Sequence, residues 1–327
     1  MMSMEKSRNV EFLRKIDDRG YPTDYLLARI RGRRAHLIAD WRPLVLSESP
    51  VDRLAFTRYG SIMTGDYPEG IRRYLLKEFE WVYSRMNRTL REIFRPFFLY
   101  VELNTIFICL RYAMGKETGK IERTLSSSLL SEKIKGILRG GENLFSVVGG
   151  IEDCFTYLSN RFSGLRNILE NAGLQGVELT LSTRYLEYIV HSKLHPVMKD
   201  FFVSIIDSRN ILSLYKYIWL NGKIAPPFIT GGRISETMFM EIADKKDLLE
   251  IGSMVRKLIR IEFEAANIET SLYRMVTRLL RKAGREPLGV GLILDYLWRS
   301  SLEATNLSIL LYGSEVDSGI ITAELIQ

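Results

Sequence analysis

Apolar residues recur along most of the chain at intervals of three and four positions, the spacing that places them on one face of an α-helix. One such stripe, between positions 71 and 93, consists of Leu75, Phe79, Val82, Met86, Leu90 and Ile93. Another, over residues 268–279, stops before Gly284, a residue type that commonly follows a helix C-terminus. Similar stripes cover residues 24–38, 97–114, 202–220 and 292–311. Sustained period-two alternation is hard to find, so we predict an all-α protein.

Three of the predicted helical segments share a layout: aromatic residues, a carboxylate, an asparagine, further apolar residues and a glycine. Their asparagines, Asn104, Asn210 and Asn306, lie 106 and 96 residues apart. Asp207 and Glu303 each precede their asparagine by three positions, which places both side chains on one helix face, whereas Glu102 is one residue out of register. The layout predicts three divergent helical repeats of about 100 residues each. We place them at residues 1–120, 121–225 and 226–327.

An asparagine inside an apolar helix needs an explanation, because an amide is costly to bury without partners. Its two donors and two acceptor sites can tie neighbouring helices together when all are satisfied. We therefore predict a structural, helix-packing role for the repeat residues, with a binding site as the alternative. These residues are Asn104, Asp207, Asn210, Glu303 and Asn306.

Charge adds a candidate interface. The 46 Lys and Arg residues exceed the 39 Asp and Glu residues, for a net charge of +7. This modest surplus permits an acidic partner, nucleic acid or an anionic membrane surface, and requires none of them. The basic run near the N-terminus is a candidate partner interface, and a solvated helix face is the alternative. It consists of Arg29, Arg31, Arg33 and Arg34.

The sequence gives little support for a catalytic function. The sequence lacks a phosphate-binding loop, a complete dinucleotide-binding fingerprint and a Gly-x-Ser-x-Gly motif. His191 and His195 have the i, i+4 spacing of metal ligands, but no third ligand is evident, so we prefer a packed or surface helix face. We expect no catalytic residue, cofactor or metal.

The expected location is cytoplasmic. Cys109 and Cys154 lie in apolar surroundings, as buried thiols in a reducing compartment do. The longest stretch without Asp, Glu, Lys or Arg is eleven residues, too short for a membrane span, which needs about 18 or more apolar residues. The N-terminal residues lack the apolar core of a secretory signal.

The repeats carry a family resemblance. The string YLWRSSLEATNLSILLYGSEVDSGIITAELI resembles the last repeat of the C subunit of prokaryotic V-type (A-type) ATP synthases, which is called the d subunit in vacuolar ATPases. That family has a Tyr-Leu pair, a glutamate, Asn-Leu-Arg, a glycine and a closing amphipathic helix. The matching positions are Tyr296, Leu297, Glu303, Asn306, Leu307, Gly313 and residues 320–325. Ser308 stands in place of the arginine.

Two further segments are similar to the same family. The middle segment matches at Asp207, Asn210, Ile211, Gly222, Gly231, Gly232 and Ser235. The opening helix matches at Tyr25, Ala28, Arg29 and Arg31, so the likeness runs from Asp24 to the end of the chain.

The resemblance implies a fold and a function. Members of this family are non-catalytic rotor parts in which three similar helical subdomains form a funnel with pseudo-threefold symmetry. The funnel sits between the central shaft of the ATP-hydrolysing head and the membrane ring of ion-carrying subunits, and it transmits torque. The implied partners are shaft and ring, with membrane contact through these partners alone and with neither nucleic acid nor a small-molecule substrate. The alternative is a free-standing α-helical repeat scaffold that binds an acidic protein or RNA.

Overall fold

The computed structural model describes residues 11–47, 49–55, 57–60, 67–140, 143–259, 267–313 and 318–326. Within these ranges there is no β-strand, and the sole β-type pairing is an isolated antiparallel bridge between Leu13 and Leu130. The predicted all-α class is confirmed. The chain divides into two compact units. Unit 1 comprises Met1–Arg19 and Arg91–Lys193, and unit 2 comprises Gly20–Leu90 and Leu194–Gln327. The division into three repeats stays a prediction.

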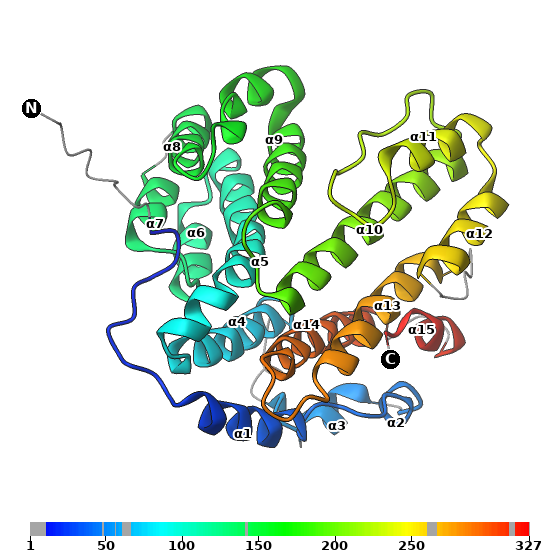
Figure 1. Cartoon of the computed structure of the whole chain (residues 1–327). Helices are drawn as coiled ribbons and strands as arrows, with labels where there is room; N and C mark the ends of the chain where they lie inside the picture. The colour runs from blue at the N-terminus through cyan, green and yellow to red at the C-terminus, as the bar shows by residue number, and fades with distance from the viewer. Residues whose placement is uncertain are drawn as a thin grey trace, which may run out of the picture. The chain divides into compact units, whose positions relative to one another are not determined.

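Unit 1 is built around two long helices, which Figure 1 shows side by side. They are α5 (Arg88–Met114), whose first residues still belong to unit 2, and α9 (Leu165–Val190). The buried Tyr185 of α9 donates its hydroxyl to the Pro96 carbonyl of α5 at 2.8 Å. The shorter helices are α6 (Thr118–Ser126), α7 (Glu132–Arg139), α8 (Leu144–Thr156) and the 3-10 turn η2 (Asn160–Phe162).

The N-terminal segment of unit 1 is fixed by its backbone and by one aromatic side chain. The Ser131 N–H donates to the Phe12 carbonyl at 2.8 Å, and the Arg14 N–H donates to the Leu129 carbonyl at 2.8 Å. The buried Phe12 ring packs edge-on against Phe155 of α8, with centroids 4.7 Å apart. This segment therefore closes the core of unit 1 from a distant part of the sequence.

Unit 2 contains the remaining helices. They are α1 (Thr23–Arg34), α2 (Arg42–Val45), α3 (Pro50–Ala55), α4 (Tyr67–Arg85), α10 (Pro196–Trp219), α11 (Glu236–Lys245), α12 (Leu248–Ile259), α13 (Ile268–Ala283), α14 (Gly291–Tyr312) and α15 (Ser318–Glu324). Helix α14 is central, because α1, α3, α4, α13 and α15 all pack against it. Every residue from 291 to 298 is buried, as expected for a helix that is covered on all sides.

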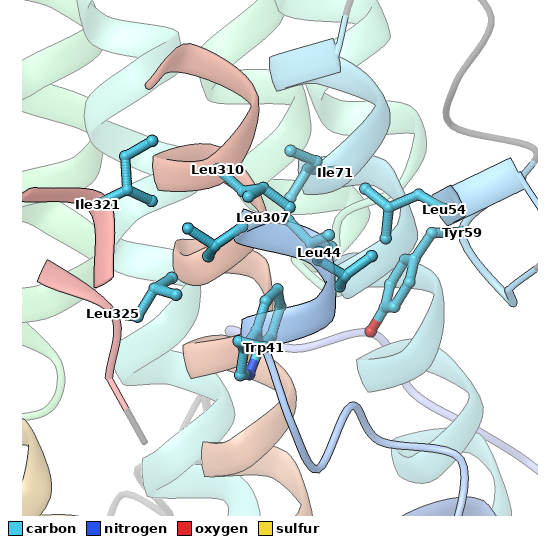
Figure 2. Packing of buried hydrophobic residues seen from close by; sticks show 10 residues of the cluster. Trp41, Leu44, Leu54, Tyr59, Ile71, Leu307, Leu310, Ile321 and Leu325 are labelled. Carbon is cyan, nitrogen blue, oxygen red and sulfur yellow. The ribbon is translucent and has the colours of Figure 1, made fainter. Parts of the chain in front are cut away.

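The far half of α14 contributes to an apolar cluster, shown in Figure 2, in which short helices from both ends of the sequence meet. Leu307 and Leu310 of α14 pack with residues of α2, α3, α4 and α15 and of the segments next to these helices. These include Trp41, Leu44, Leu54, Tyr59, Ile71, Ile321 and Leu325. Since α2 and α3 are too short to be stable alone, this burial is what holds them in place.

The single helix predicted over residues 71–93 is two helices in the structure. Helix α4 ends at Arg85 and α5 begins at Arg88. The Asn87 side chain accepts the Leu90 N–H at 3.0 Å, as an N-cap does, and its amide donates to Thr23 at 3.0 Å. Gly20 lies against this break with φ of +73°, and a Cβ there would collide with the Met86 backbone. The apolar stripe continues across the break, so periodicity alone did not reveal it.

One described helix, α5, is long and apolar enough to cross a membrane by length and composition, although the uncharged stretches of the sequence predicted no span. A core helix of a soluble protein passes the same test, so one such helix is weak support for a span. In α5, 56% of the apolar window is buried inside the structure.

Candidate functional site

Glu102 of α5 is fully buried in unit 1, where both carboxylate oxygens accept hydrogen bonds. Oε1 accepts the Leu129 backbone N–H at 2.6 Å, and Oε2 accepts the Ser128 hydroxyl at 2.8 Å. Ser131 then caps α7 by accepting the Ile134 N–H at 3.5 Å. Glu102 thereby fixes the segment that leads into α7.

Asp207 of α10 has the same arrangement in unit 2. Its Oδ1 accepts the backbone N–H groups of Arg233 at 2.8 Å and Ile234 at 3.4 Å, and the Arg233 guanidinium lies 3.4 Å from Oδ2. Glycine is favoured at position 232, because a Cβ would lie too close to Oδ1 and would displace the carboxylate. Burial raises the pKa of the Asp207 carboxyl, while the hydrogen bonds and the positive charge of Arg233 oppose that shift.

Glu303 of α14 is buried and has the strongest set of donors of the three carboxylates. Its Oε1 accepts the Ile38 N–H at 2.5 Å, and its Oε2 accepts the Tyr59 hydroxyl and the Arg58 guanidinium. Arg58 also lies 4.9 Å from the centroid of the Tyr59 ring. Burial, followed by the negative charge of Glu303, raises the pKa of Tyr59, so this hydroxyl stays protonated and acts as a donor.

Asn210 and Asn306 make one and the same contact, which we call the asparagine clamp. Each donates through Nδ2 to a backbone carbonyl and accepts the N–H of that same residue. The distances are 2.8 and 2.8 Å between Asn210 and Ile229, and 2.8 and 2.9 Å between Asn306 and Ile326. Both asparagines are buried, so each clamp satisfies polar groups of the helix and of the segment it holds.

Asn104 does not share this position. It is exposed, whereas Thr105, three residues after Glu102, is buried. Two residues correspond to about 200° around a helix and three to about 300°, so a side chain two positions after Glu102 points away from the face that Glu102 occupies. The predicted packing role therefore does not fit Asn104, and the position that corresponds to Asn210 is occupied by Thr105.

The three carboxylates are used alike. Each accepts the N–H of a residue in a connecting segment, and that residue lies two to four positions before the first residue of a helix. These N–H groups belong to Leu129 before α7, Ile234 before α11 and Ile38 before α2. A buried carboxylate that accepts backbone donors makes strong, charge-assisted hydrogen bonds, so each one anchors a connecting segment to a core helix.

The basic run at the end of α1 is divided between internal contacts and solvent. Arg33 donates to both oxygens of Glu78 at 2.7 and 2.9 Å, and its guanidinium lies 3.7 Å from the centroid of the Trp81 ring. The Tyr296 hydroxyl donates to the same Glu78 carboxylate at 2.6 Å. Arg33 is therefore a structural residue within unit 2.

Its neighbours differ from one another. Arg34 pairs with the buried Asp295 at 3.0 Å, and Arg31 donates to the Pro287 carbonyl. Arg29 is exposed, and its side chain makes no hydrogen bond or ion pair with any residue that the structure describes. Of the four predicted interface residues, Arg29 is the one that is exposed and whose side chain has no hydrogen bond or ion pair within the described residues.

The two histidines near the α9–α10 junction have separate local roles. His191 is exposed, and its Nδ1 lies 2.7 Å from the Glu187 carbonyl within α9. His195 caps α10 by accepting the Val197 N–H at 3.4 Å. Over the described ranges, no three His, Cys, Asp or Glu side chains cluster as metal ligands do.

The buried polar groups described above bind other parts of the same chain and so have a structural role. A comparison with known families identifies the kind of protein. Residues 26–319 match the ATP synthase (C/AC39) subunit family. The chain belongs to this family. No curated protein matches the chain in a sequence search. The resemblance that the repeats carry, to the C subunit of A-type synthases and the d subunit of vacuolar ATPases, is thereby confirmed.

Membership settles the coarse function. The ATP synthase (C/AC39) subunit is a non-catalytic stalk subunit of V/A-type rotary ATPases and a peripheral part of that complex. The chain is therefore a subunit of a rotary ATPase, and its partners are other subunits of the same complex.

Sequence reasoning missed Glu78 and Asp295, the acidic partners of the basic run. Glu78 follows Leu75 by three positions and so lies on the apolar stripe of α4, and Asp295 interrupts the apolar run over residues 292–298. A carboxylate on a buried face signals an internal cation, because a buried charge needs a partner. These two carboxylates were visible in the sequence, although their positions do not identify which arginine pairs with each of them.

Proposed function

We propose that this chain is the rotor subunit that joins the central shaft of the catalytic head to the membrane ring of ion-carrying subunits. In this position it transmits torque during ATP synthesis or ATP-driven ion transport. It lies on the cytoplasmic side and touches the membrane through its partners alone. The family match over residues 26–319 is the observation that carries the proposal.

The internal contacts support this role physically. A part that transmits torque must resist deformation, and connecting segments are usually where a helical protein yields first. Here buried carboxylates and asparagine clamps attach such segments to core helices, through Glu102, Asp207, Asn210, Glu303 and Asn306. Rigidity of this kind would allow the subunit to transmit force without local unfolding.

A candidate contact for a rotor partner lies on α1. Arg29 is exposed, and Tyr25, one turn earlier on the same helix face, is 48% exposed. The Tyr25 ring packs edge-on against Tyr21 with centroids 4.9 Å apart, so its orientation is fixed before a partner arrives. Tyrosine and arginine are enriched at the centres of protein interfaces, which favours this pair as part of the binding surface.

The test is co-purification of the full chain with the shaft subunits and, separately, with the detergent-solubilised ring. We expect the wild-type chain to bind both at low and moderate salt. We expect Arg29→Glu to weaken binding to one of them at least tenfold without lowering the melting temperature, because this exposed side chain makes no hydrogen bond or ion pair with the rest of the described chain. Failure of the wild-type chain to bind either partner contradicts the proposal and favours a free-standing scaffold.

Two further variants separate an interface effect from a folding effect. Arg278→Glu changes an exposed arginine on α13 and should leave both interactions unchanged. Arg33→Glu places a second carboxylate beside Glu78 and should lower the melting temperature before any interaction is measured. If Arg29→Glu and Arg278→Glu behave alike, Arg29 is not an interface residue.

A further inference from the structure

A cavity of about 610 Å³ lies in unit 2 where α1, α13 and α14 meet, and its lining is strongly basic. Five arginines line it: Arg31, Arg34, Arg281, Arg285 and Arg299. Its volume falls within the range of about 300–1,000 Å³ that is typical of small-molecule sites. Arg281 and Arg285 are exposed and therefore accessible to a ligand from solvent.

The positive charge of this cavity exceeds what the surrounding structure neutralises. Asp295 is the single carboxylate among the lining residues, and it pairs with Arg34. The C-termini of α1 and α13 also face the cavity through their capping residues Ala35 and Gly284, and each end contributes about half a negative charge. Counting the lining residues and these two helix ends, about three positive charges remain in excess.

Two features of the lining suit an anion that also carries a hydrogen-bond donor. Burial lowers the pKa of Arg299, and the nearby cations Arg281 and Arg34 lower it further, while the carboxylates of Asp295 and Glu303 oppose the shift. A bound anion would relieve that repulsion. Asp295 is buried, and its Oδ1 has no hydrogen-bond partner within the described structure, since Arg34 is bound to Oδ2. A buried acceptor of this kind calls for a ligand hydroxyl or amine.

We propose that the cavity between α1, α13 and α14 binds a small organic polyphosphate that carries at least two phosphate groups and a free hydroxyl. Guanidinium groups bind phosphate oxygens in a two-pronged geometry. A phosphate group carries about 1.5 to 2 negative charges at neutral pH, so two such groups match the uncompensated charge. An acidic protein segment would need about three separate carboxylates inside the same space, which is why we favour the phosphorylated ligand. A soluble sugar phosphate and the headgroup of a phosphorylated lipid share this chemistry.

The first test is titration calorimetry of the full chain with fructose 1,6-bisphosphate, 1,6-hexanediol bisphosphate and inorganic phosphate at fixed salt. The sugar bisphosphate should bind at least tenfold more tightly than inorganic phosphate, because two phosphates meet the arginines together. It should also bind at least threefold more tightly than the hexanediol compound, which offers no hydroxyl to Asp295. Equal binding of all three, or equally tight binding of a hexaglutamate peptide, would overturn the proposal.

Matched variants locate the site. Arg281→Gln and Arg285→Gln change exposed cavity residues, so both variants should fold, and each should weaken sugar bisphosphate binding at least tenfold. Arg278→Gln changes an exposed arginine of the same helix that does not line the cavity, and its affinity should stay within twofold of the wild-type value. Equal losses in all three variants would mean that general surface charge, not this cavity, binds the ligand.

A sedimentation assay distinguishes the two sources. The chain is mixed with phosphatidylcholine vesicles that contain a lipid with a bisphosphorylated inositol headgroup. Co-sedimentation that Arg285→Gln abolishes supports the polyphosphate site with a lipid source. Calorimetric binding without co-sedimentation supports the same site with a soluble source, and absence of both refutes it.

Discussion

Helices α10 and α14 of unit 2 carry similar motifs that serve different purposes. The asparagine clamps are alike, since Asn210 and Asn306 hold residues 19 and 20 positions further along the chain. The carboxylates differ. Asp207 closes a loop to a residue 26 positions ahead, whereas Glu303 binds a backbone N–H that lies 265 positions back in the sequence.

The difference shows what each group contributes to the fold. The Asp207 contact organises one local connection, and its cation Arg233 is 38% exposed. The Glu303 contact attaches the segment before α2 to a helix near the end of the chain, and its cation Arg58 is 17% exposed. Unit 2 consists of two stretches separated by unit 1 in the sequence, so Glu303 is one of the groups that joins these stretches.

The largest expected effect comes from neutralising the two carboxylates. Glu303→Gln leaves the mostly buried Arg58 without its counter-charge, and removing one partner of a buried pair costs about 3–5 kcal/mol of unfolding free energy. Asp207→Asn leaves Arg233, which can turn towards water, so its cost should be smaller by about 1 kcal/mol or more. Urea unfolding of the two variants measures the difference. Equal costs would mean that the long-range contact of Glu303 is no stronger than the local one.

A second, smaller effect concerns the clamps. Asn210→Leu and Asn306→Leu each strand the buried N–H and carbonyl of one isoleucine, at a cost of about 1–3 kcal/mol. Asn104→Leu provides the matched control, because this asparagine is exposed and its replacement should change stability by less than about 0.5 kcal/mol. Thermal melting of the three variants tests the register of the motif. A loss at Asn104 as large as the other two would show that all three asparagines are equivalent.

The smallest expected effect is a pH dependence at Asp207. Burial raises the pKa of this carboxyl above its ordinary value of 3.8, so the folded state holds the proton more tightly than the unfolded state. The resulting stabilisation is complete below that ordinary value and is lost as the pH rises through the folded-state pKa. Wild-type stability relative to Asp207→Asn should therefore decline from about pH 3 towards neutrality. A relative stability that increases over this range would place the folded-state pKa below 3.8 instead.

Local patterns in the sequence predicted local structure well. The stripe over residues 268–279 became α13, and Gly284 is its C-cap as predicted. The predicted helix over residues 71–93 was wrong at residues 86 and 87, because capping by Asn87 depends on a contact with Thr23 that apolar periodicity does not report. The packing role predicted for Asn104 was wrong for a related reason. It rested on the residue type that Asn104 shares with Asn210 and Asn306, whereas the position around the helix axis decides which side chain is buried.

Long-range partners could not be predicted in the same way. Arg33 and Arg34 read as an exposed basic run, and their acidic partners lie 45 and 261 positions away. Nothing in a local window specifies such a pair, although Asp295 within an apolar run indicated that some cation had to meet it. The basic cavity could not be predicted either, because its lining residues come from α1, α13 and α14, which are far apart in the sequence.

The most direct test of the rotor assignment is to watch this chain during catalysis. The intact ATPase is immobilised through its catalytic head, a bead is attached to an engineered cysteine on this subunit, and ATP is added. Our account predicts that the bead rotates in step with a bead attached to the shaft. A bead that stays still on this subunit while the shaft rotates would place the chain in the stationary part of the complex and contradict the account.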